Sequence, residues 1–127
     1  MSKEIQFLLD NQEAFQNKMG YRFEEMTEAE IAKYIKDQSY WVTEELHEMT
    51  RELPFIKSWK DYTHLSPEEK FDMSVRAKEE YIDLIHFIMN IGAALGFSGR
   101  EIMDMYCEKH KINCQRQEDP SLGYVNK

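Results

Sequence analysis

The chain has 127 residues and a formal net charge of −8 at pH 7, with 42% hydrophobic and 31% charged residues. This length supports one domain, residues 1–127, with a single core, and the composition is ordinary for a folded protein. The acidic balance, without a long cluster of Lys and Arg, argues against a general nucleic-acid binder. If the ligand is a polyanion, metal ions must therefore mediate the contact.

The cysteines and the apolar runs bear on the cellular compartment. Cys107 and Cys114 stand seven residues apart, a spacing that indicates neither a zinc site nor a disulfide framework. The N-terminal residues lack signal-peptide architecture, and the longest apolar run, 84–97, is too short for a membrane span and contains two polar residues, His86 and Asn90. We expect a reduced, cytoplasmic protein without membrane contact.

The first predicted helix runs roughly from Lys3 to Lys18 and stops at Gly20. Its apolar stripe is formed by Ile5, Leu8, Leu9, Phe15 and Met19. Gln12 and Gln16 fall on the same stripe. A buried Gln needs partners at both ends of its amide, and either a neighbouring helix or a ligand could supply them. For any single Gln the structural interpretation is favoured.

A capping box at Thr27–Glu30 opens the second predicted helix. This helix should run to about Leu53, because Pro54 forbids its continuation. Residues 37–40 are weakly helical, so the helix can bend or break there.

The connection that follows, residues 54–65, is aromatic and basic, so it should pack on something. Trp59 and Lys60 could flank a nucleotide. Alternatively, Trp59 is a plug in the core and Lys60 its solvated neighbour.

The third predicted helix begins at Ser66, with Pro67 in its first turn and Glu69 at the third position. It is amphipathic until about Lys78, then turns apolar and closes at Gly96. A helix that is apolar all round is a buried helix. Because a chain of this length can scarcely surround it, we expect a homodimer formed around this helix.

A further capping box at Ser98–Glu101 opens a short final helix. After it the chain turns cationic, and a flexible C-terminal tail is predicted from about residue 112. The residues suited to a phosphate chain are Lys109, Lys111, Asn113 and Arg116. An exposed, solvated terminus is the alternative. Helices without a strand pattern predict an all-α fold, a bundle of four to five helices.

Two pairs of acids lie on the second and third helices. Glu45 and Glu48 are spaced i, i+3, as are Glu80 and Asp83, so each pair stacks on one helix face and the two helices together can form a four-carboxylate cage. The segment after Glu80 is apolar, and no Lys or Arg occurs between residues 78 and 100 to neutralise buried charge. Oxygen ligands of this kind favour Mg²⁺, with Mn²⁺ as a substitute. The alternative is a solvated acidic face.

The residues from about 41 to 124 resemble the dimeric all-α dUTPases, within the group of all-α NTP pyrophosphatases that also holds MazG-like enzymes and phage dCTP pyrophosphatases. The shared signature, EExxE followed by ExxD, is matched by residues 44–48 and 80–83. The flanking matches are Pro54, Trp59-Lys60, His86-Phe87, Tyr106, Lys109, Asn113, Arg116-Gln117 and Gly123-Tyr124. The chain departs from these relatives in having Ser58 before Trp59, where they often have a second tryptophan, and in a wider spacing before Gly123.

The resemblance implies a hydrolase that converts dUTP to dUMP with release of pyrophosphate, with dUDP as a further candidate substrate. It implies that Glu45, Glu48, Glu80 and Asp83 hold Mg²⁺, with Glu48 the first candidate and Glu45 the second for the general base. It assigns substrate contacts to Gln12, Phe15, Gln16, Trp59, Lys60, His86, Lys109, Asn113 and Arg116. A dCTP or broader NTP pyrophosphatase shares the cage but not the base pocket. The third alternative is a non-enzymatic helical interaction protein, in which the acids are only surface charge.

Overall fold

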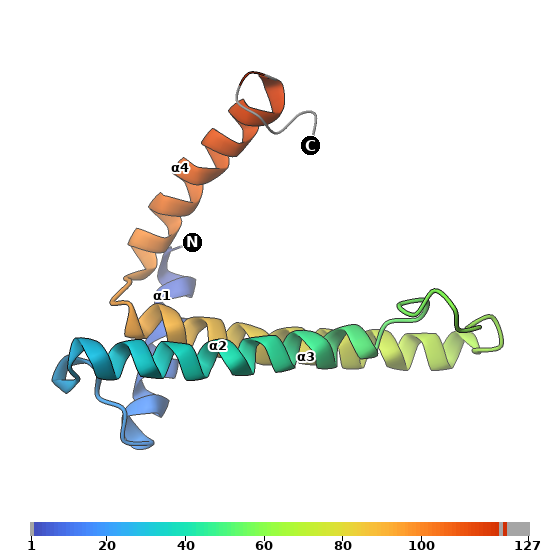
Figure 1. Cartoon of the computed structure of the whole chain (residues 1–127), viewed down its shortest axis with the longest axis horizontal. Helices are drawn as coiled ribbons and strands as arrows, with labels where there is room; N and C mark the ends of the chain where they lie inside the picture. Colours follow the sequence, from blue (N-terminus) through green and yellow to red (C-terminus); the bar gives the residue numbers. More distant parts are fainter. Residues whose placement is uncertain (1, 120, 122–127) are drawn as a thin grey trace.

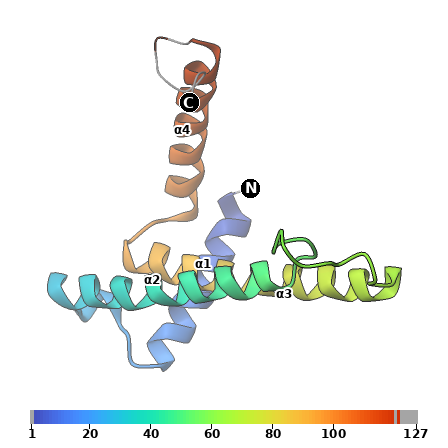
Figure 2. The same cartoon turned by 45° about the vertical axis from the view of Figure 1, so that its right-hand side comes forward.

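The computed structural model describes residues 2–119 and 121. Within them the chain forms four α-helices, one 3₁₀ turn and no strand, which confirms the all-α class. The elements are α1 (Ser2–Lys18), η1 (Phe23–Glu25), α2 (Glu28–Arg51), α3 (Pro67–Ala94) and α4 (Gly99–Glu118). Figure 1 and Figure 2 show them in two orientations.

Three of the helices begin at the capping boxes that the sequence predicts. Thr27, Ser66 and Ser98 each accept a hydrogen bond from the backbone N–H three residues further on. The glutamate at that third position accepts one in return from the backbone N–H of the capping residue. Each box therefore satisfies two backbone groups that the start of a helix leaves without an intrahelical partner.

Two stretches are more helical than the sequence suggests. α2 runs through residues 37–40 without a break, and the Ser39 hydroxyl donates back to the Ile35 carbonyl at 2.8 Å. α4 continues to Glu118, so residues 112–118, which we expected in a flexible tail, are helical. Residues 115–118 are all good helix formers, and Arg116 lies in the last turn, where a cation interacts favourably with the helix dipole.

The remainder of the predicted C-terminal tail follows α4 in the sequence. Residues 120 and 122–127, which include Gly123 and Tyr124 of the motif, lie outside the described residues.

α2 and α3 form a long antiparallel hairpin that carries both acid pairs. These two helices make the most extensive contacts in the chain, and α1 contacts both α3 and α4. Figure 1 shows α1 crossing the hairpin, and Figure 2 shows α4 pointing away from it. The hairpin is therefore the scaffold to which the other two helices attach.

The close approach of α1 to its neighbours depends on two glycines. The Gly99 N–H donates to Gln6 Oε1 at 2.7 Å. A Cβ at Gly99 would overlap the Ser2 carbonyl oxygen and lie 2.7 Å from the Gln6 backbone nitrogen. A Cβ at Gly92 would instead meet the flexible end of Leu9 at 3.2 Å. The contact between α1 and α4 therefore requires glycine at position 99, whereas Gly92 is less constrained.

Much of the apolar surface of the chain stays exposed. The accessible surface is 9670 Å², against about 7,100 Å² expected for a monomeric protein of this mass. The buried hydrophobic residues in the described part are Leu9, Tyr34, Tyr62, Ala77 and Ala93. Among the described residues, no single helix is long and apolar enough to cross a membrane. α3 and α4 taken together meet the length and composition of a membrane span, but they are bent by 104° relative to each other.

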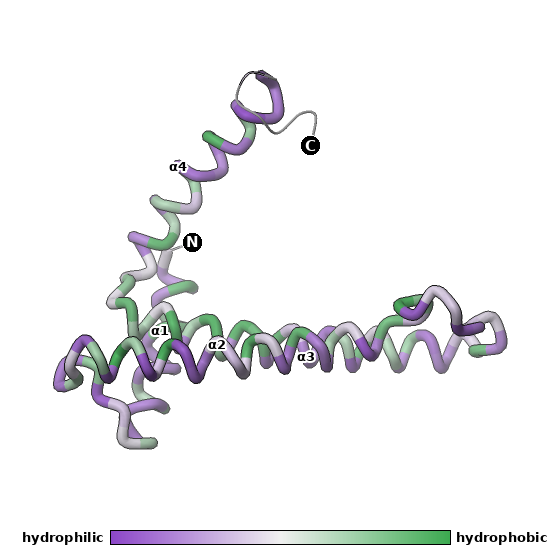
Figure 3. Tube along the Cα trace, in the orientation of Figure 1, coloured by the Kyte–Doolittle hydropathy of each residue, from purple (hydrophilic) through white to green (hydrophobic). Residues whose placement is uncertain are grey.

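An apolar groove of about 430 Å³ occupies the angle between α3 and α4. Leu95, Met105 and Tyr106 line it and are 60%, 50% and 62% exposed. Figure 3 shows hydrophobic residues gathered where α3 meets α4. We propose that a second copy of the chain covers this groove, since a typical partner buries about 800 Å², well within the excess surface.

The first prediction concerns this dimer. Light scattering at micromolar concentration should return about twice the chain mass of 15.2 kDa. Leu95→Glu should shift the protein towards the monomer, because a charge at an apolar contact is costly to bury. Tyr40→Glu, at a 58% exposed aromatic residue on α2 outside the groove, serves as the control. A monomeric wild-type protein would contradict the proposal.

The second prediction concerns the two glycines. Gly99→Ala should lower the melting temperature clearly, because the new methyl group overlaps backbone atoms of α1. Gly92→Ala should change it much less, since the Leu9 side chain can move and alanine favours the helix by about 1 kcal/mol. Thermal unfolding followed by circular dichroism compares the two variants. Equal melting temperatures would show that α1 does not pack as described.

Candidate functional site

The acids come together where α2 packs on α3. α2 supplies Glu45 and Glu48 and α3 supplies Glu80, and one carboxylate oxygen of each lies within 4.8 Å of the others. Asp83, the fourth predicted ligand, lies a turn further along α3, and its charge acts on both Glu45 and Glu80. The i, i+3 spacing thus brings the predicted acids to one region of the hairpin.

This concentration of negative charge alters proton binding. Burial raises the pKa of Glu45 to about 7, and a hydrogen bond shared with Glu80 and the charges of Glu48 and Asp83 act in the same direction. For Glu80, the hydrogen bond with Glu45 lowers the pKa, but burial and the charges of Glu48 and Asp83 outweigh it, so its pKa is raised. Glu45 and Glu80 therefore hold protons more tightly than isolated carboxylates do.

The cluster also fits a hard divalent cation. Glu45 Oε2 and Glu80 Oε2 are buried and have no hydrogen-bond partner among the described residues. An acceptor that is shielded from water without a hydrogen-bond partner is unfavourable, and more so when it is charged. A cation would satisfy both oxygens, and a donor set made of carboxylate oxygens suits Mg²⁺ or Mn²⁺. Acids that merely lined a solvated face would not leave such buried oxygens.

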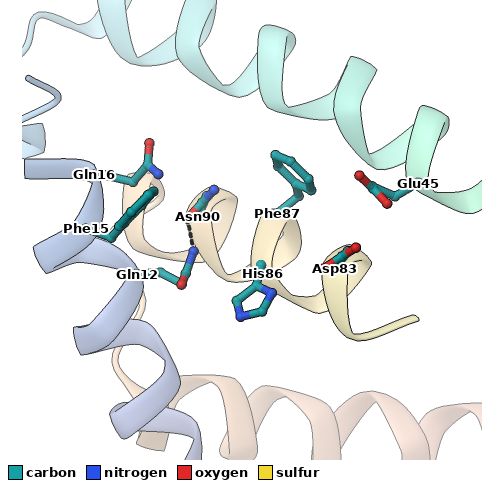
Figure 4. Close-up of a pocket in the computed structure, with 8 residues that line it drawn as sticks. All are labelled: Gln12, Phe15, Gln16, Glu45, Asp83, His86, Phe87 and Asn90. Carbon is teal, nitrogen blue, oxygen red and sulfur yellow. Dashed lines mark hydrogen bonds between the residues drawn. The ribbon is translucent and has the colours of Figure 1, made fainter. Parts of the chain in front are cut away.

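A pocket of about 580 Å³ extends from this cluster to α1. Its lining residues are Gln12, Phe15, Gln16, Glu45, Asp83, His86, Phe87 and Asn90. Figure 4 shows the α1 amides towards one end and the carboxylates of Glu45 and Asp83 towards the other. The volume lies within the range of about 300–1,000 Å³ usual for small-molecule sites. One cavity is therefore lined both by acids of the cluster and by predicted substrate-contact residues, which are His86 and the three α1 residues Gln12, Phe15 and Gln16.

Hydrogen bonds hold the polar side chains at the α1 end of the pocket. Gln12 Nε2 donates to Asn90 Oδ1 at 2.8 Å, and Asn90 Nδ2 donates to Gln38 Oε1 at 2.9 Å. Separately, the Tyr34 hydroxyl donates to Gln16 Oε1 at 2.8 Å. A neighbouring helix thus supplies one partner for each α1 amide. The opposite ends, Gln12 Oε1 and Gln16 Nε2, have no partner in the described part of the chain.

Two predicted substrate contacts lie in the loop between α2 and α3, at the far end of the hairpin (Figure 1). Trp59 is 82% exposed, so the alternative interpretation of this residue as a core plug is wrong. Tyr62 fills that position instead, at 6% exposure and packed on Phe55. The Lys60 ammonium lies 5.4 Å from the centroid of the Tyr62 ring. Neither Trp59 nor Lys60 lines the pocket.

Three further predicted contacts, Lys109, Asn113 and Arg116, lie on α4. α4 points away from the hairpin (Figure 2), and Lys109 lines the apolar groove instead of the pocket. Within one chain, none of the three lines the pocket. Their contact with phosphate or sugar stays a prediction, and it requires an approach of α4 that a single copy does not make.

Sequence reasoning missed four residues of this region, namely Tyr34, Gln38, Phe87 and Asn90. For Asn90 a signal was present, because an Asn inside the apolar run 84–97 needs a hydrogen-bond partner once it is buried. Nothing in the sequence around Gln38 distinguishes it from an ordinary exposed helical residue.

Comparison with known proteins finds two phage relatives. A dCTP pyrophosphatase of Enterobacteria phage T4 is 24% identical over 113 residues, which cover 73% of this chain and 64% of the relative. A dCTP pyrophosphatase of Enterobacteria phage LZ5 is 28% identical over 134 residues, covering 93% of this chain and 77% of the relative. The chain thus spans less than two thirds of the T4 protein. No family model matches the chain, and no solved structure matches it significantly.

These similarities indicate distant homology to phage dCTP pyrophosphatases. The all-α structure is consistent with the all-α NTP pyrophosphatases that the motifs resemble. Both relatives are named for dCTP, whereas the motif flanks of this chain resemble those of dUTPases.

The third prediction follows from Glu45. Because its pKa is raised in the folded state, from 4.5 to about 7, the folded protein binds this proton more tightly than the unfolded chain does. The metal-free protein should therefore gain stability as the pH falls from 8 towards 5, with a rise in melting temperature on the order of 5 °C. Mg²⁺ at pH 8 should stabilise it as well, because the ion binds the ionised cluster.

Melting curves with a chelator and with added Mg²⁺, recorded between pH 5 and 8, measure both effects. Glu45→Gln should remove most of the pH dependence, because a neutral amide replaces the titrating group. Glu44→Gln, at the neighbouring acid, is the control and should keep the dependence. A melting temperature of the metal-free protein that stays constant across this range would contradict the electrostatic account.

Proposed function

We propose that this chain is a nucleotide pyrophosphatase, which hydrolyses a pyrimidine deoxynucleoside triphosphate, with dCTP preferred, to the monophosphate and pyrophosphate. One observation carries the proposal: a single pocket has carboxylates at one end and unpaired amide groups at the other. A triphosphate needs cations to neutralise it, and a base needs hydrogen-bond donors and acceptors. The distant relatives named dCTP pyrophosphatase support the same reaction class.

At the acidic end, Glu45, Glu48, Glu80 and Asp83 would hold Mg²⁺ or Mn²⁺. Bound cations would supply charge neutralisation for the triphosphate and would lower the pKa of a bound water. A carboxylate near the attacking water can accept its proton, and this works best when its pKa lies near the working pH. The two acids of α2, Glu48 first and Glu45 second, are the candidates for this base.

At the other end, Phe15 offers an aromatic ring beside the α1 amides, and Phe87 lies between Asn90 and Glu45 (Figure 4). Phe15 is 55% exposed, so its ring is accessible for stacking on a base or for contact with the sugar. His86 lines the same pocket between the acids and the amides. The substrate would thus lie with its phosphates on the hairpin acids and its base against α1.

The choice of base separates the two leading substrates. dCTP is preferred here because both relatives carry that name. dUTP is the second candidate, favoured by the Trp59-Lys60 and His86-Phe87 matches to the dUTPase motifs. A non-enzymatic interaction protein fits less well, since buried carboxylate oxygens without partners suit a ligand better than a solvated acidic face.

The fourth prediction tests the reaction. With Mg²⁺, the protein should release pyrophosphate from dCTP, and EDTA should abolish the activity. Glu48→Gln and Asp83→Asn should each lower kcat/KM at least about 100-fold, because each removes a charged cation ligand without changing side-chain volume. Turnover of dCTP, dUTP, dTTP, CTP and UTP, followed by pyrophosphate release, makes the measurement.

Glu79→Gln provides the matched control, because this exposed acid precedes Glu80 on α3 and is not one of the carboxylates that cluster. It should keep near wild-type turnover, and circular dichroism should show an intact helical fold in all three variants. Full activity in Glu48→Gln or Asp83→Asn would rule out the carboxylate cage. dUTP turnover ahead of dCTP would favour the second candidate substrate.

A further inference from the structure

We infer that Gln38 of α2, acting through Asn90 of α3, determines which end of the Gln12 amide faces the pocket and thereby selects the base. The inference rests on the proposed function and concerns the specificity of the same site. Gln38 does not line the pocket, so it is a positioning residue. Its role is to orient a side chain that could meet the substrate.

The three side chains form a series of amides joined head to tail. Gln12 donates to Asn90, and Asn90 donates to Gln38. Each amide has an oxygen that accepts and a nitrogen that donates, so turning one amide forces its neighbour to turn. Two arrangements satisfy every contact, namely the observed one and its inverse, in which Gln38 donates to Asn90 and Asn90 donates to Gln12.

Mixed arrangements are disfavoured because of burial. Asn90 is only 3% exposed, so if it turned alone, its oxygen and nitrogen would face like groups and stay unpaired. Leaving a buried donor or acceptor unpaired costs about 1–3 kcal/mol. The series therefore behaves as a two-state relay, and a side chain of fixed hydrogen-bonding character at position 38 would select the state.

The two states present different groups to a base. In the observed state, Gln12 Oε1 is the unpaired end, and an acceptor matches the N4 amino group of cytosine. In the inverse state, Gln12 Nε2 would be unpaired, and a donor matches the carbonyl at the same position of uracil. The observed state is thus the one suited to cytosine.

The second α1 amide does not make this distinction. The Tyr34 hydroxyl occupies Gln16 Oε1 and leaves Nε2 as a donor. A donor can meet the O2 carbonyl, which cytosine and uracil share. Gln16, 6% exposed, would therefore bind either pyrimidine, and the discrimination lies with Gln12 and the relay behind it.

The fifth prediction uses two substitutions at position 38 with opposite hydrogen-bonding character. Gln38→Glu gives an acceptor only, which must receive the Asn90 N–H and so holds the observed state. Gln38→Lys gives a donor only, which must donate to Asn90 Oδ1 and so imposes the inverse state. The measurement is the ratio of kcat/KM for dCTP to kcat/KM for dUTP.

We expect Gln38→Glu to keep or raise this ratio and Gln38→Lys to lower it at least about tenfold. Gln38→Met, which can neither donate nor accept strongly, should bring the ratio closer to one. Asp37→Lys introduces a positive charge at the neighbouring, exposed position and should leave the ratio unchanged. Long-range effects of charge on the triphosphate act on both substrates alike and cancel in the ratio.

The outcomes separate this inference from the proposed function. If the wild type releases pyrophosphate but the ratio stays constant, or moves in one direction in both charged variants, the relay is overturned and the reaction stands. If the wild type hydrolyses none of the nucleotides, both are overturned. If melting curves show that Gln38→Lys does not fold, Gln38→Met and Gln38→Glu decide the matter, since a ratio equal to the wild type in Gln38→Met overturns the relay.

Discussion

The mutual repulsion of carboxylates across the contact between α2 and α3 is the constraint around which the site is built. The hairpin packs Glu45 against Glu80 and leaves a buried oxygen of each without a partner. The nearby cation on α3, Arg76, does not relieve this, because its Nε bonds Glu52 at 2.7 Å at the end of α2. Burial and the neighbouring carboxylates raise the pKa of Glu45 to about 7, so either a bound proton or a cation can compensate the charge. A site of this kind is costly to assemble empty, and for that reason a compensating ion would stabilise it.

The position of α1 turns this charged hairpin into a pocket. Leu9, 2% exposed, packs against Gly92 on α3, and Gly99 brings the start of α4 against the first turns of α1. These contacts fix the side of α1 that carries Gln12 and Gln16 above the hairpin. Without them the acids would still cluster, but nothing would close the other end of the cavity. The small glycine contacts therefore determine where a substrate's base would lie.

The sequence predicts the scaffold better than the site. Helix starts were predictable because a capping box is a local arrangement of four residues, and the acid pairs were predictable because i, i+3 spacing places them on one face. The predicted end of the last helix was wrong, because the cationic character of residues 109–117 was given more weight than their helix propensity. The relay could not be derived, since Gln12 and Gln38 reach Asn90 across 78 and 52 residues of sequence. Likewise, the choice of Tyr62 over Trp59 for the buried position in the loop depends on tertiary packing that neither side chain reveals.

The two ends of the pocket obey different physical rules, and this explains why the substrate is harder to infer than the reaction. At the acidic end, chemistry depends on the number and spacing of carboxylates, which the sequence displays directly. At the other end, recognition of a base would depend on the direction of amides, and the same residues in an inverted relay would present a donor in place of an acceptor. Identical residues against the base could therefore serve cytosine or uracil, according to a side chain that does not line the pocket. Motifs that resemble those of dUTPases can then occur in a chain whose relatives are named dCTP pyrophosphatase. The residue that would set the preferred base is not part of those motifs.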